Sequence, residues 1–501
     1  MNLRISRQDW ATLKSDAVVA IISEDQEPEN GRIGALDERL GGLLAQLRNS
    51  GEFKGERNET VVLFRPRGVE VERLVLAGIG PRGDASFGTL RAAVHGAVSA
   101  LRGFTLGRLV IISPLWQDRC ECVQAITEGI VLSEFTASEY KTEDRSEVKI
   151  GEVTIAVSGE TDLAELESGV NRGSILSKAA NLARWLTNEP GNQINPTSFA
   201  DHAARVAEKC DLELKILDEA EMQQRGMNAI LAVARGSSHP AKLVVLVYKG
   251  AEDPSENPIA FVGKGVTFDS GGISLKPAKS MEEMKADKAG ACSVLGAMQA
   301  ISKLGIKANV VAVLPVVENL PGGGAQRPGD VIRSFSGKTI EVINTDAEGR
   351  LILADALSYV RKEFNPRRLV DIATLTGACV VALGHIRAGL FSNDDDFCTD
   401  VLEAADRCGE RLWRLPLDQE YRKEIESQIA DVKNVGSRWG GASIAAKFLE
   451  EFVGDTPWCH IDIAGVDLFR EKQAAEGPTG FGVRTLVEVA ICCSQHSEKR
   501  V

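Results

Sequence analysis

Short apolar, β-branched runs that alternate with helical patterns constrain the fold of this chain more than any other feature. In the first 160 residues such runs lie at 17–23, 61–64, 73–78 and 108–113, and a helical pattern lies at 89–101. Strands that alternate with helices favour an α/β domain with a mostly parallel sheet. We therefore interpret this first part as an α/β domain, and it contains no recognisable set of catalytic residues.

The same alternation returns after residue 190. Strands are predicted at 242–248, 259–262, 309–314, 339–343, 369–373 and 458–463, and helices at 198–210, 288–304, 351–363 and 444–452. A chain of 501 residues is longer than one core usually organises, so two domains are expected. We predict an N-terminal α/β domain over 1–162, a linker helix over 163–190 that Pro190 and Gly191 stop, and a C-terminal α/β domain over 191–501.

Composition limits the functions that the chain can have. The net charge is −13 and only 5% of the residues are aromatic, which argues against nucleic acid as a partner. The ten cysteines form no C-x-x-C pair, and Cys210, Cys292, Cys379 and Cys459 lie among apolar residues, as small core side chains do. The N-terminus lacks the pattern of a signal peptide, and no apolar stretch is long enough to cross a membrane, so a cytoplasmic location is expected.

A first polar segment, VGKGVTFDSGGISLK (262–276), follows an apolar strand. Ligands of open α/β sheets bind beyond the carboxyl ends of strands, where Lys264 and Asp269 would emerge. Lys276 lies on the same loop and has no carboxylate partner nearby in the sequence. A tight surface loop with a solvated lysine would give the same pattern.

Two further segments carry carboxylates. Asp287 in MKADKAGA (284–291) stands before a long helix, where an aspartate is most often only an N-cap. Asp346 and Glu348 in NTDAEGR (344–350) are two residues apart in a turn that is expected to be non-helical, so both carboxylates could aim at one point. Arg350 adds a positive charge beside them; a capping cluster with an ion pair is the alternative.

Together these segments supply four carboxylates with a summed charge of −4, which two divalent cations would cancel. Oxygen ligands with bridging carboxylates suit two metals that clamp an attacking and a leaving atom. His385 and His460 lie outside these segments and are expected to be core or supporting residues.

The chain resembles the leucyl aminopeptidase (cytosol aminopeptidase) family in these three segments and in five others. The likeness extends from about Ala180 to Glu488, while the N-terminal part is only loosely similar to the macro-type domain of that family. The other five segments are RWLTNEPGNQINP (184–196), ENLPGGGAQRPGDVI (318–332), DIATLTGACVVALG (371–384), DVKNVGSRWGGASIAAKFL (431–449) and PWCHIDIAG (457–465).

The resemblance implies a macro-like N-terminal domain and a metallo-aminopeptidase catalytic domain with a mixed, mostly parallel sheet. It also implies two divalent ions per subunit, Mn²⁺ or Zn²⁺ with Mg²⁺ or Co²⁺ as alternatives, and a homohexamer. It assigns the metals to Lys264, Asp269, Asp287, Asp346 and Glu348, polarisation of the scissile carbonyl to Lys276, a bicarbonate to Arg350, and the first side-chain pocket to Met284, Thr374, Gly377 and Ala464.

The expected activity is hydrolysis of the N-terminal residue, leucine and other mainly apolar residues, from peptides with a free N-terminus. A water that bridges the metals would attack the first peptide carbonyl. Two departures concern the pocket: Lys288 stands where the family commonly has Met, and the variable stretch 466–473 reads VDLFREKQ. A two-metal phosphohydrolase and a DNA-binding role are the rival functions; the missing phosphate cradle and the acidic charge weigh against them.

Overall fold

The computed structural model describes residues 1–25, 31–114, 119–143, 147–158, 160–470 and 477–498. It divides into two compact units, the first comprising Met1–Lys178 and the second Ala179–Arg470 with the chain from Gly477 onward. The division falls inside a single long helix, α5 (Leu163–Asn188), which occupies the segment predicted as a linker. The predicted domain limits remain a proposal.

The first unit is built on a six-stranded sheet of order β1-β6-β5-β2-β4-β3, in which only β3 is antiparallel to its neighbour. The strands are β1 (Asn2–Ser6), β2 (Ala17–Ile22), β3 (Thr60–Phe64), β4 (Arg73–Gly78), β5 (Thr105–Ile112) and β6 (Lys149–Ala156). Helices α3 (Phe87–Ser99) and α4 (Cys120–Leu132) belong to one core, and α1 (Gly31–Arg39) and α2 (Leu43–Ser50) to the other.

Strand β2 shows why this sheet needs helices on both faces. Ala17, Val19 and Ile21 pack in the core that includes α3 and α4. Val18, Ala20 and Ile22 point to the opposite face and pack in the core that includes α1 and α2. Because successive side chains of a strand point to opposite faces, an unbroken apolar run is stable only when both faces are covered. The predicted α/β architecture is confirmed.

The second unit has a nine-stranded sheet of order β16-β15-β18-β14-β9-β11-β8-β7, with β10 paired to β11. The strands are β7 (Glu213–Leu217), β8 (Lys242–Lys249), β9 (Ile259–Gly263), β10 (Gly265–Asp269), β11 (Asn309–Asn319), β14 (Arg368–Ala373), β15 (Ala388–Ser392), β16 (Leu412–Arg414) and β18 (Trp458–Asp462). The sheet is mixed and mostly parallel, as expected. The predicted strand at 339–343 is β13 (Thr339–Glu341), which joins β12 (Val331–Arg333) and β17 (Val432–Lys433) in a separate three-stranded sheet.

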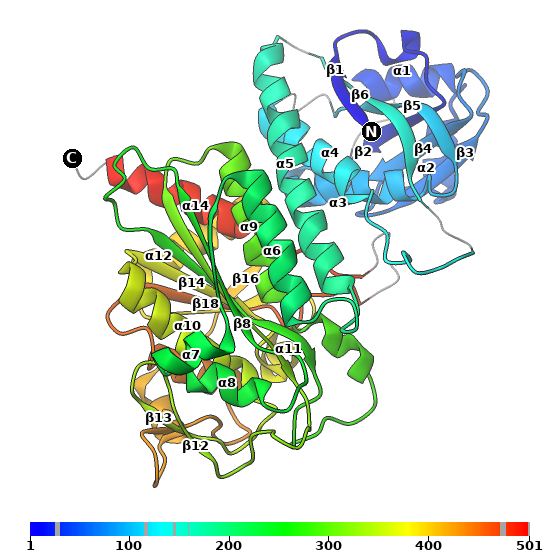
Figure 1. Ribbon diagram of the computed structural model, residues 1–501. Helices are drawn as coiled ribbons and strands as arrows, with labels where there is room; N and C mark the ends of the chain where they lie inside the picture. The colour runs from blue at the N-terminus through cyan, green and yellow to red at the C-terminus, as the bar shows by residue number, and fades with distance from the viewer. Residues whose placement is uncertain (26–30, 115–118, 144–146, 159, 471–476, 499–501) are drawn as a thin grey trace. The chain divides into compact units, whose positions relative to one another are not determined.

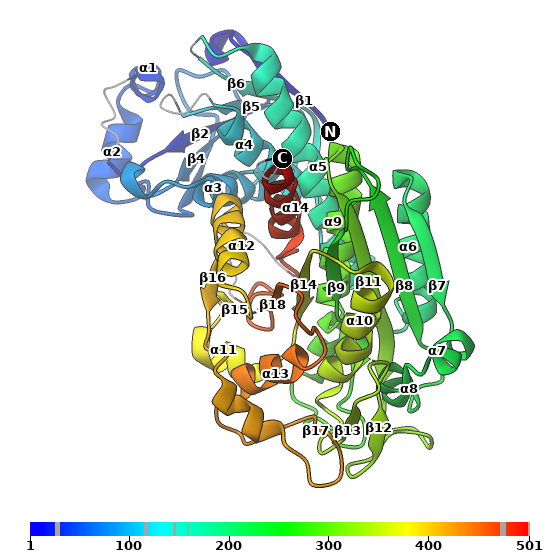
Figure 2. The same cartoon turned by 90° about the vertical axis from the view of Figure 1, so that its left-hand side faces the viewer.

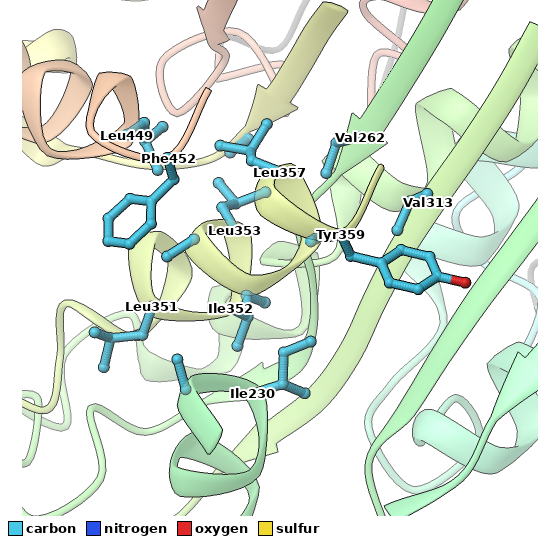
Figure 3. Close-up of a cluster of buried hydrophobic side chains, with 14 of the residues drawn as sticks. Ile230, Val262, Val313, Leu351, Ile352, Leu353, Leu357, Tyr359, Leu449 and Phe452 are labelled. Atoms are coloured by element: carbon cyan, nitrogen blue, oxygen red, sulfur yellow. The ribbon is translucent and has the colours of Figure 1, made fainter. Parts of the chain in front are cut away.

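Helices cover both faces of the large sheet (Figures 1 and 2). One layer contains α6 (Pro196–Cys210), α9 (Ala289–Leu304), α12 (Asp395–Cys408) and α14 (Val483–Glu498); the other contains α8 (Asn228–Ala234) and α10 (Glu348–Phe364), with α13 (Gly441–Glu450) packed on α10. Figure 3 shows Leu353 and Leu357 of α10 among Val262 of β9 and Leu449 of α13. This core holds α10 firmly against the sheet. The helices α7 (Glu219–Arg225) and α11 (Gly377–Leu383) have 7 residues each, as α8 does.

Five strands of the large sheet run in one direction, β10, β11, β9, β14 and β18, because each is parallel to the next in that chain of pairs. Their carboxyl ends therefore lie at one edge of the sheet, at Asp269, Asn319, Gly263, Ala373 and Asp462. Polar residues that follow these strands meet at this edge, which is where open α/β sheets bind ligands.

Two further predictions can be compared with the structure. The ten cysteines are all free thiols, and Cys210, Cys292, Cys379 and Cys459 are buried as expected. Within the described residues, no helix combines the length and the apolar character that a membrane crossing would require.

Candidate metal centre

A cavity of about 570 Å³ opens at the carboxyl edge of the large sheet. All eleven site residues predicted from the sequence line it: Lys264, Asp269, Lys276, Met284, Asp287, Asp346, Glu348, Arg350, Thr374, Gly377 and Ala464. They come from five separate stretches of the chain, so the fold brings scattered motifs to one cavity.

Lys264 stands between β9 and β10, a second strand that the sequence did not predict. Its side chain is 4% exposed, and Nζ lies 2.8 Å from Asp287 Oδ1 and 2.9 Å from Glu348 Oε1. Nζ also donates to the carbonyl of Thr374 at 2.9 Å. Gly349 makes room for this side chain, since a Cβ there would lie 2.7 Å from Lys264 Cε. The reading of Lys264 as a solvated loop lysine is therefore wrong.

Asp287 does not cap the helix that follows it. The N-cap of α9 is Lys288, without a side-chain capping bond, and Asp287 ends the short 3-10 helix Met281–Ala286. Its Oδ1 instead accepts a hydrogen bond from Thr374 Oγ1 at 2.7 Å in addition to the Lys264 ion pair. The N-cap interpretation is wrong because the side chain turns into the cavity.

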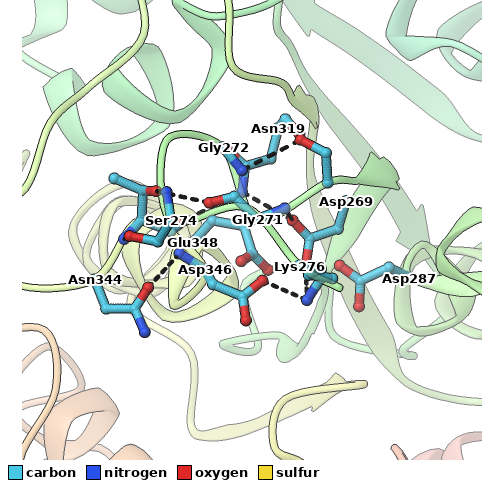
Figure 4. Close-up of polar contacts among 12 residues, drawn as sticks. Asp269, Gly271, Gly272, Ser274, Lys276, Asp287, Asn319, Asn344, Asp346 and Glu348 are labelled. Atoms are coloured by element: carbon cyan, nitrogen blue, oxygen red, sulfur yellow. Dashed lines mark hydrogen bonds and ion pairs between the residues drawn. The ribbon is translucent and has the colours of Figure 1, made fainter. Parts of the chain in front are cut away.

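Asp269 ends β10 and is held from three sides (Figure 4). The N–H of Gly271 and the amide of Asn319 each donate to Oδ1 at 2.8 Å, and Lys276 Nζ lies 2.7 Å from Oδ2. Lys276 also pairs with Asp346. Lys276 thus has two carboxylate partners, although none was evident from its sequence neighbours. Gly271 adopts φ +86°, the left-handed region that suits glycine, and lets the loop fold back over Asp269.

The turn at 344–348 presents Asp346 and Glu348 to the same point. Asn344 Oδ1 accepts from the N–H of Asp346 at 2.9 Å, and Thr345 Oγ1 donates to the carbonyl of Gly271 at 2.6 Å. Glu348 is the first residue of α10, so the expectation that both acids lie in a non-helical turn is wrong for this one. One oxygen each of Asp269, Asp346 and Glu348 lie within 4.8 Å of one another.

The positively charged side chains of this cluster do not neutralise its carboxylates. Burial, with repulsion from Asp269, raises the pKa of Asp346 and of Glu348, and burial also raises the pKa of Asp287 well above its usual range. Asp287 Oδ2 and Glu348 Oε2 are buried and have no hydrogen-bond partner among the described residues. Four carboxylates against two lysines, with oxygens left unpartnered, fit bound divalent cations.

The two lysines respond to the same charges. Burial alone would lower the pKa of Lys264, but Asp287, Glu348 and Asp269 outweigh burial and raise it. The pKa of Lys276 is raised in the same way, with Asp269 as the main opposing charge. Bound divalent cations would act in the opposite sense, because they favour neutral amines nearby.

Arg350 is buried on the first turn of α10. Its Nη1 donates to the carbonyl of Asn434 at 2.6 Å, while Nε has no hydrogen-bond partner among the described residues. Burial lowers the pKa of Arg350 to about 10, against the effect of Glu348 and Asp462. A buried donor without an acceptor suits a small anion such as bicarbonate.

Three residues that hold the site in place were not identified from the sequence. Asn434 holds the turn at 343–344 through its side chain, Asn319 orients Asp269, and Asp462 accepts from the N–H groups of Leu375 and Ala464. All three are buried polar residues, Asn319 and Asp462 at the ends of buried strands and Asn434 beside the short strand β17. That combination is the signal that could have identified them, because a buried polar group needs a partner.

The four predicted pocket residues form the wall beside the carboxylates. Thr374 and Gly377 follow β14, Ala464 follows β18, and Met284 lies on the 3-10 helix before Asp287. Lys288 does not line the cavity; it is buried and donates to the carbonyls of Glu189 and Lys285. Of the variable stretch 466–473, residues 471–473 lie outside the described part of the chain.

The oxygen-rich cluster at the edge of the α/β sheet could hold metal ions, and comparison with known proteins shows the class of protein that carries it. Residues 181–487 match the catalytic domain of the cytosol aminopeptidase family, and residues 18–144 match the N-terminal domain of that family. The chain therefore belongs to the cytosol aminopeptidase family and is a metal-dependent aminopeptidase.

Curated relatives and solved structures agree with this. The probable cytosol aminopeptidase of Solibacter usitatus is 44% identical over 98% of this chain and 99% of its own length. That of Aquifex aeolicus is 41% identical over 97% and 98%. A mutant of tomato leucine aminopeptidase has a TM-score of 0.88 at 31% identity, covering 98% of this chain and 96% of its own. The bottromycin maturation enzyme BotP in complex with Mn has a TM-score of 0.83 at 34% identity, over 96% and 100%.

Proposed function

We propose that the chain is a two-metal leucyl aminopeptidase that removes leucine and other mainly apolar residues from the N-terminus of peptides. Lys264, Asp269, Asp287, Asp346 and Glu348 would hold two divalent ions. The observation that carries this proposal is the cluster of four carboxylates, three of them buried, in which two oxygens have no hydrogen-bond partner in the described part of the chain. When bound, the metals supply Lewis acidity, which polarises a carbonyl and lowers the pKa of water.

Lys276 is the residue assigned to the scissile carbonyl. Its side chain is 22% exposed and lies at the cavity wall, so it can reach a bound peptide as well as Asp269. A fixed cation beside the carbonyl oxygen would stabilise the negative charge that develops there during attack. Arg350, with its free Nε, would hold a bicarbonate that accepts a proton from the attacking water.

The pocket accounts for the expected preference for apolar residues. Met284, Thr374, Gly377 and Ala464 line the cavity next to the carboxylates, and none of them carries a charge. A small apolar wall favours aliphatic side chains through burial of their surface. The free α-amine of the substrate would bind at the metal site, which limits cleavage to the first residue.

Further details of the proposal concern the whole enzyme. We expect Mn²⁺ or Zn²⁺ as the metals, with Mg²⁺ or Co²⁺ as substitutes, a homohexamer in solution, and a cytoplasmic location. The donor set of carboxylate oxygens and one amine accommodates these ions without selecting among them. Light scattering after size exclusion would measure the subunit number.

The proposal is tested by removing metal from the enzyme, adding metal back, and measuring the cleavage of a panel of aminoacyl anilides. Dialysis against a chelator should abolish cleavage of leucine anilide, and added Mn²⁺, Zn²⁺ or Co²⁺ should restore it. An N-acetylated substrate should resist cleavage, and its hydrolysis at the same rate would refute the exopeptidase proposal. A chromogenic phosphate ester in the same panel tests the phosphohydrolase alternative.

A further inference from the structure

Two carboxylates in the cavity wall, Glu283 and Asp467, have no role in the metal cluster, and Asp467 is the one without a close ion pair among the described residues. Asp467 lies in the stretch that follows β18 and lines the same cavity as the pocket residue Ala464. Its N–H donates to the carbonyl of Ile463 at 3.0 Å, which closes a single helical turn. Residues three apart on such a turn share one side, so Asp467 flanks Ala464.

Asp467 is built into the wall and does not belong to a mobile surface. The residue is only 7% exposed, and its carbonyl accepts the N–H of Thr479 at 2.9 Å. Its Oδ1 is buried and has no hydrogen-bond partner among the described residues. Burial raises the pKa of Asp467 to about 7, while Arg470 acts in the opposite direction. A buried carboxylate with one oxygen that lacks a hydrogen-bond partner is costly, so a cation supplied by a ligand would be stabilising there.

The positively charged side chain next to Asp467 is Arg470, and it already forms an ion pair with another carboxylate. Arg470 Nη1 pairs with Glu283, which also lines the cavity and precedes the pocket residue Met284. Arg470 Nη2 stays 3.9 Å from Asp467 Oδ1, beyond hydrogen-bond distance. When Asp467 is ionised, the side chains of Glu283, Asp467 and Arg470 together carry one more negative than positive charge. A single added cation would balance this end of the cavity.

Another arginine of the cavity wall, besides Arg350 and Arg470, belongs to a different segment. Arg438 lies between β17 and α13 and stacks over the ring of Trp439 at 4.3 Å. It comes from a stretch of the chain separate from the Ala464–Arg470 turn, and no ion pair joins it to Asp467 among the described residues. The charge balance at Asp467 is therefore set by Glu283 and Arg470.

We propose that Asp467 is a specificity-determining residue that lets the pocket accept N-terminal lysine and arginine in addition to apolar residues. The aliphatic stem of such a side chain would pack on Met284 and Ala464, and its charged end would meet Asp467. This inference rests on the proposed aminopeptidase function and names a second substrate class for the same site.

The experiment compares two side chains of similar length on the metal-loaded enzyme. kcat/KM is measured for anilides of lysine, norleucine, Nε-acetyl-lysine and leucine, and the lysine-to-norleucine ratio is the readout. The wild-type ratio should be well above the ratio for Nε-acetyl-lysine to norleucine. In Asp467→Asn the lysine-to-norleucine ratio should fall roughly ten- to hundredfold, since bonds to charged groups are worth that much. Both substrates see the same preparation, so a partly unfolded variant leaves the ratio unchanged.

Two further variants sharpen the result. Glu283→Gln should release Arg470 toward Asp467 and lower the same ratio, while Asp455→Asn, an equal charge change at an exposed position outside the cavity, should not. If leucine anilide is cleaved but the ratio is unchanged in Asp467→Asn, the inference is wrong and the proposed function stands. If no anilide is cleaved after metal is added, the proposed function itself fails.

Discussion

The two units of this chain are both α/β, and among the described residues the candidate metal ligands gather in the second unit alone. In both, central strands are buried on two faces: β2 in the first unit and β9 in the second have no exposed residue. The two units differ in the residues at the carboxyl ends of their strands. Buried Ser23 and Ser113 follow β2 and β5, whereas Lys264 follows β9 and Asp269 ends β10. In both units the carboxyl ends of parallel strands meet at one edge of the sheet. The residues that follow those strands decide whether chemistry is possible there.

Buried charges show the same contrast. In the first unit Arg91 and Glu128 form an ion pair of 2.9 Å, and Glu128 also accepts from Gln124 at 2.8 Å. In the second unit four carboxylates share two lysines, and two of their oxygens have no hydrogen-bond partner where the structure describes the chain. Among the described residues, the group formed by Asp269, Asp346 and Glu348 is the only one that brings three potential ligand atoms together. A structural pair balances its charge internally, while a metal site depends on an outside cation to do so.

Lys276→Ala should have the largest effect. Loss of one preorganised donor to a developing oxyanion typically lowers kcat about 10²–10³-fold, with a smaller change in KM. Steady-state kinetics on leucine anilide measure both constants.

Because Lys276 also pairs with Asp269 and Asp346, metal content has to be measured in the same variant. Unchanged metal with low kcat supports a role in catalysis. Normal kcat would remove Lys276 from the mechanism.

Lys264→Ala should weaken metal binding at one site roughly ten- to hundredfold while the protein still folds. An amine coordinates only when it is neutral, so metal binding displaces the Lys264 proton and metal retention should rise with pH. Elemental analysis after dialysis at two pH values gives metal per subunit for wild type and variant. Two metals retained in the variant, with the same pH dependence, would show that Lys264 is not a ligand.

Gly349→Ala tests how closely the site is packed, with roughly a tenfold loss of kcat/KM expected because small misplacements are costly in active sites. The added Cβ would lie 2.7 Å from Lys264 Cε and displace that side chain. Gly83→Ala in the first unit is the matched control, since a Cβ there meets nothing within 4 Å. Equal activity of both variants would mean that the position of Lys264 does not matter.

Glu128→Gln should have the smallest effect on activity and a measurable effect on stability. It removes the negative charge that pairs with Arg91 at 2.9 Å, which costs about 1–3 kcal/mol, or a few degrees in Tm. kcat on leucine anilide should stay at the wild-type value. A loss of activity comparable to that of Gly349→Ala would contradict the separation of roles between the two units.

The sequence by itself predicted the α/β class, the strands β4 and β14 nearly to the residue, and eleven residues that line the cavity. It could do so because apolar strands that end in glycine and carboxylates are local patterns, and because three motifs resemble those of one family. Helix α10 was located from its periodicity, but its first turn, which contains Glu348, was assigned to a loop.

Only the tertiary structure determined which charged side chains form ion pairs. Asp287 has the sequence position of an N-cap, yet it pairs with Lys264 because β10 and α9 bring the two together. Lys276 reaches Asp346, 70 positions further along the chain. Asp467 gains its place beside the pocket only because the strand before it ends at the same edge as β14. Ion pairs between distant segments depend on strand order and register, and no local pattern of residues encodes those.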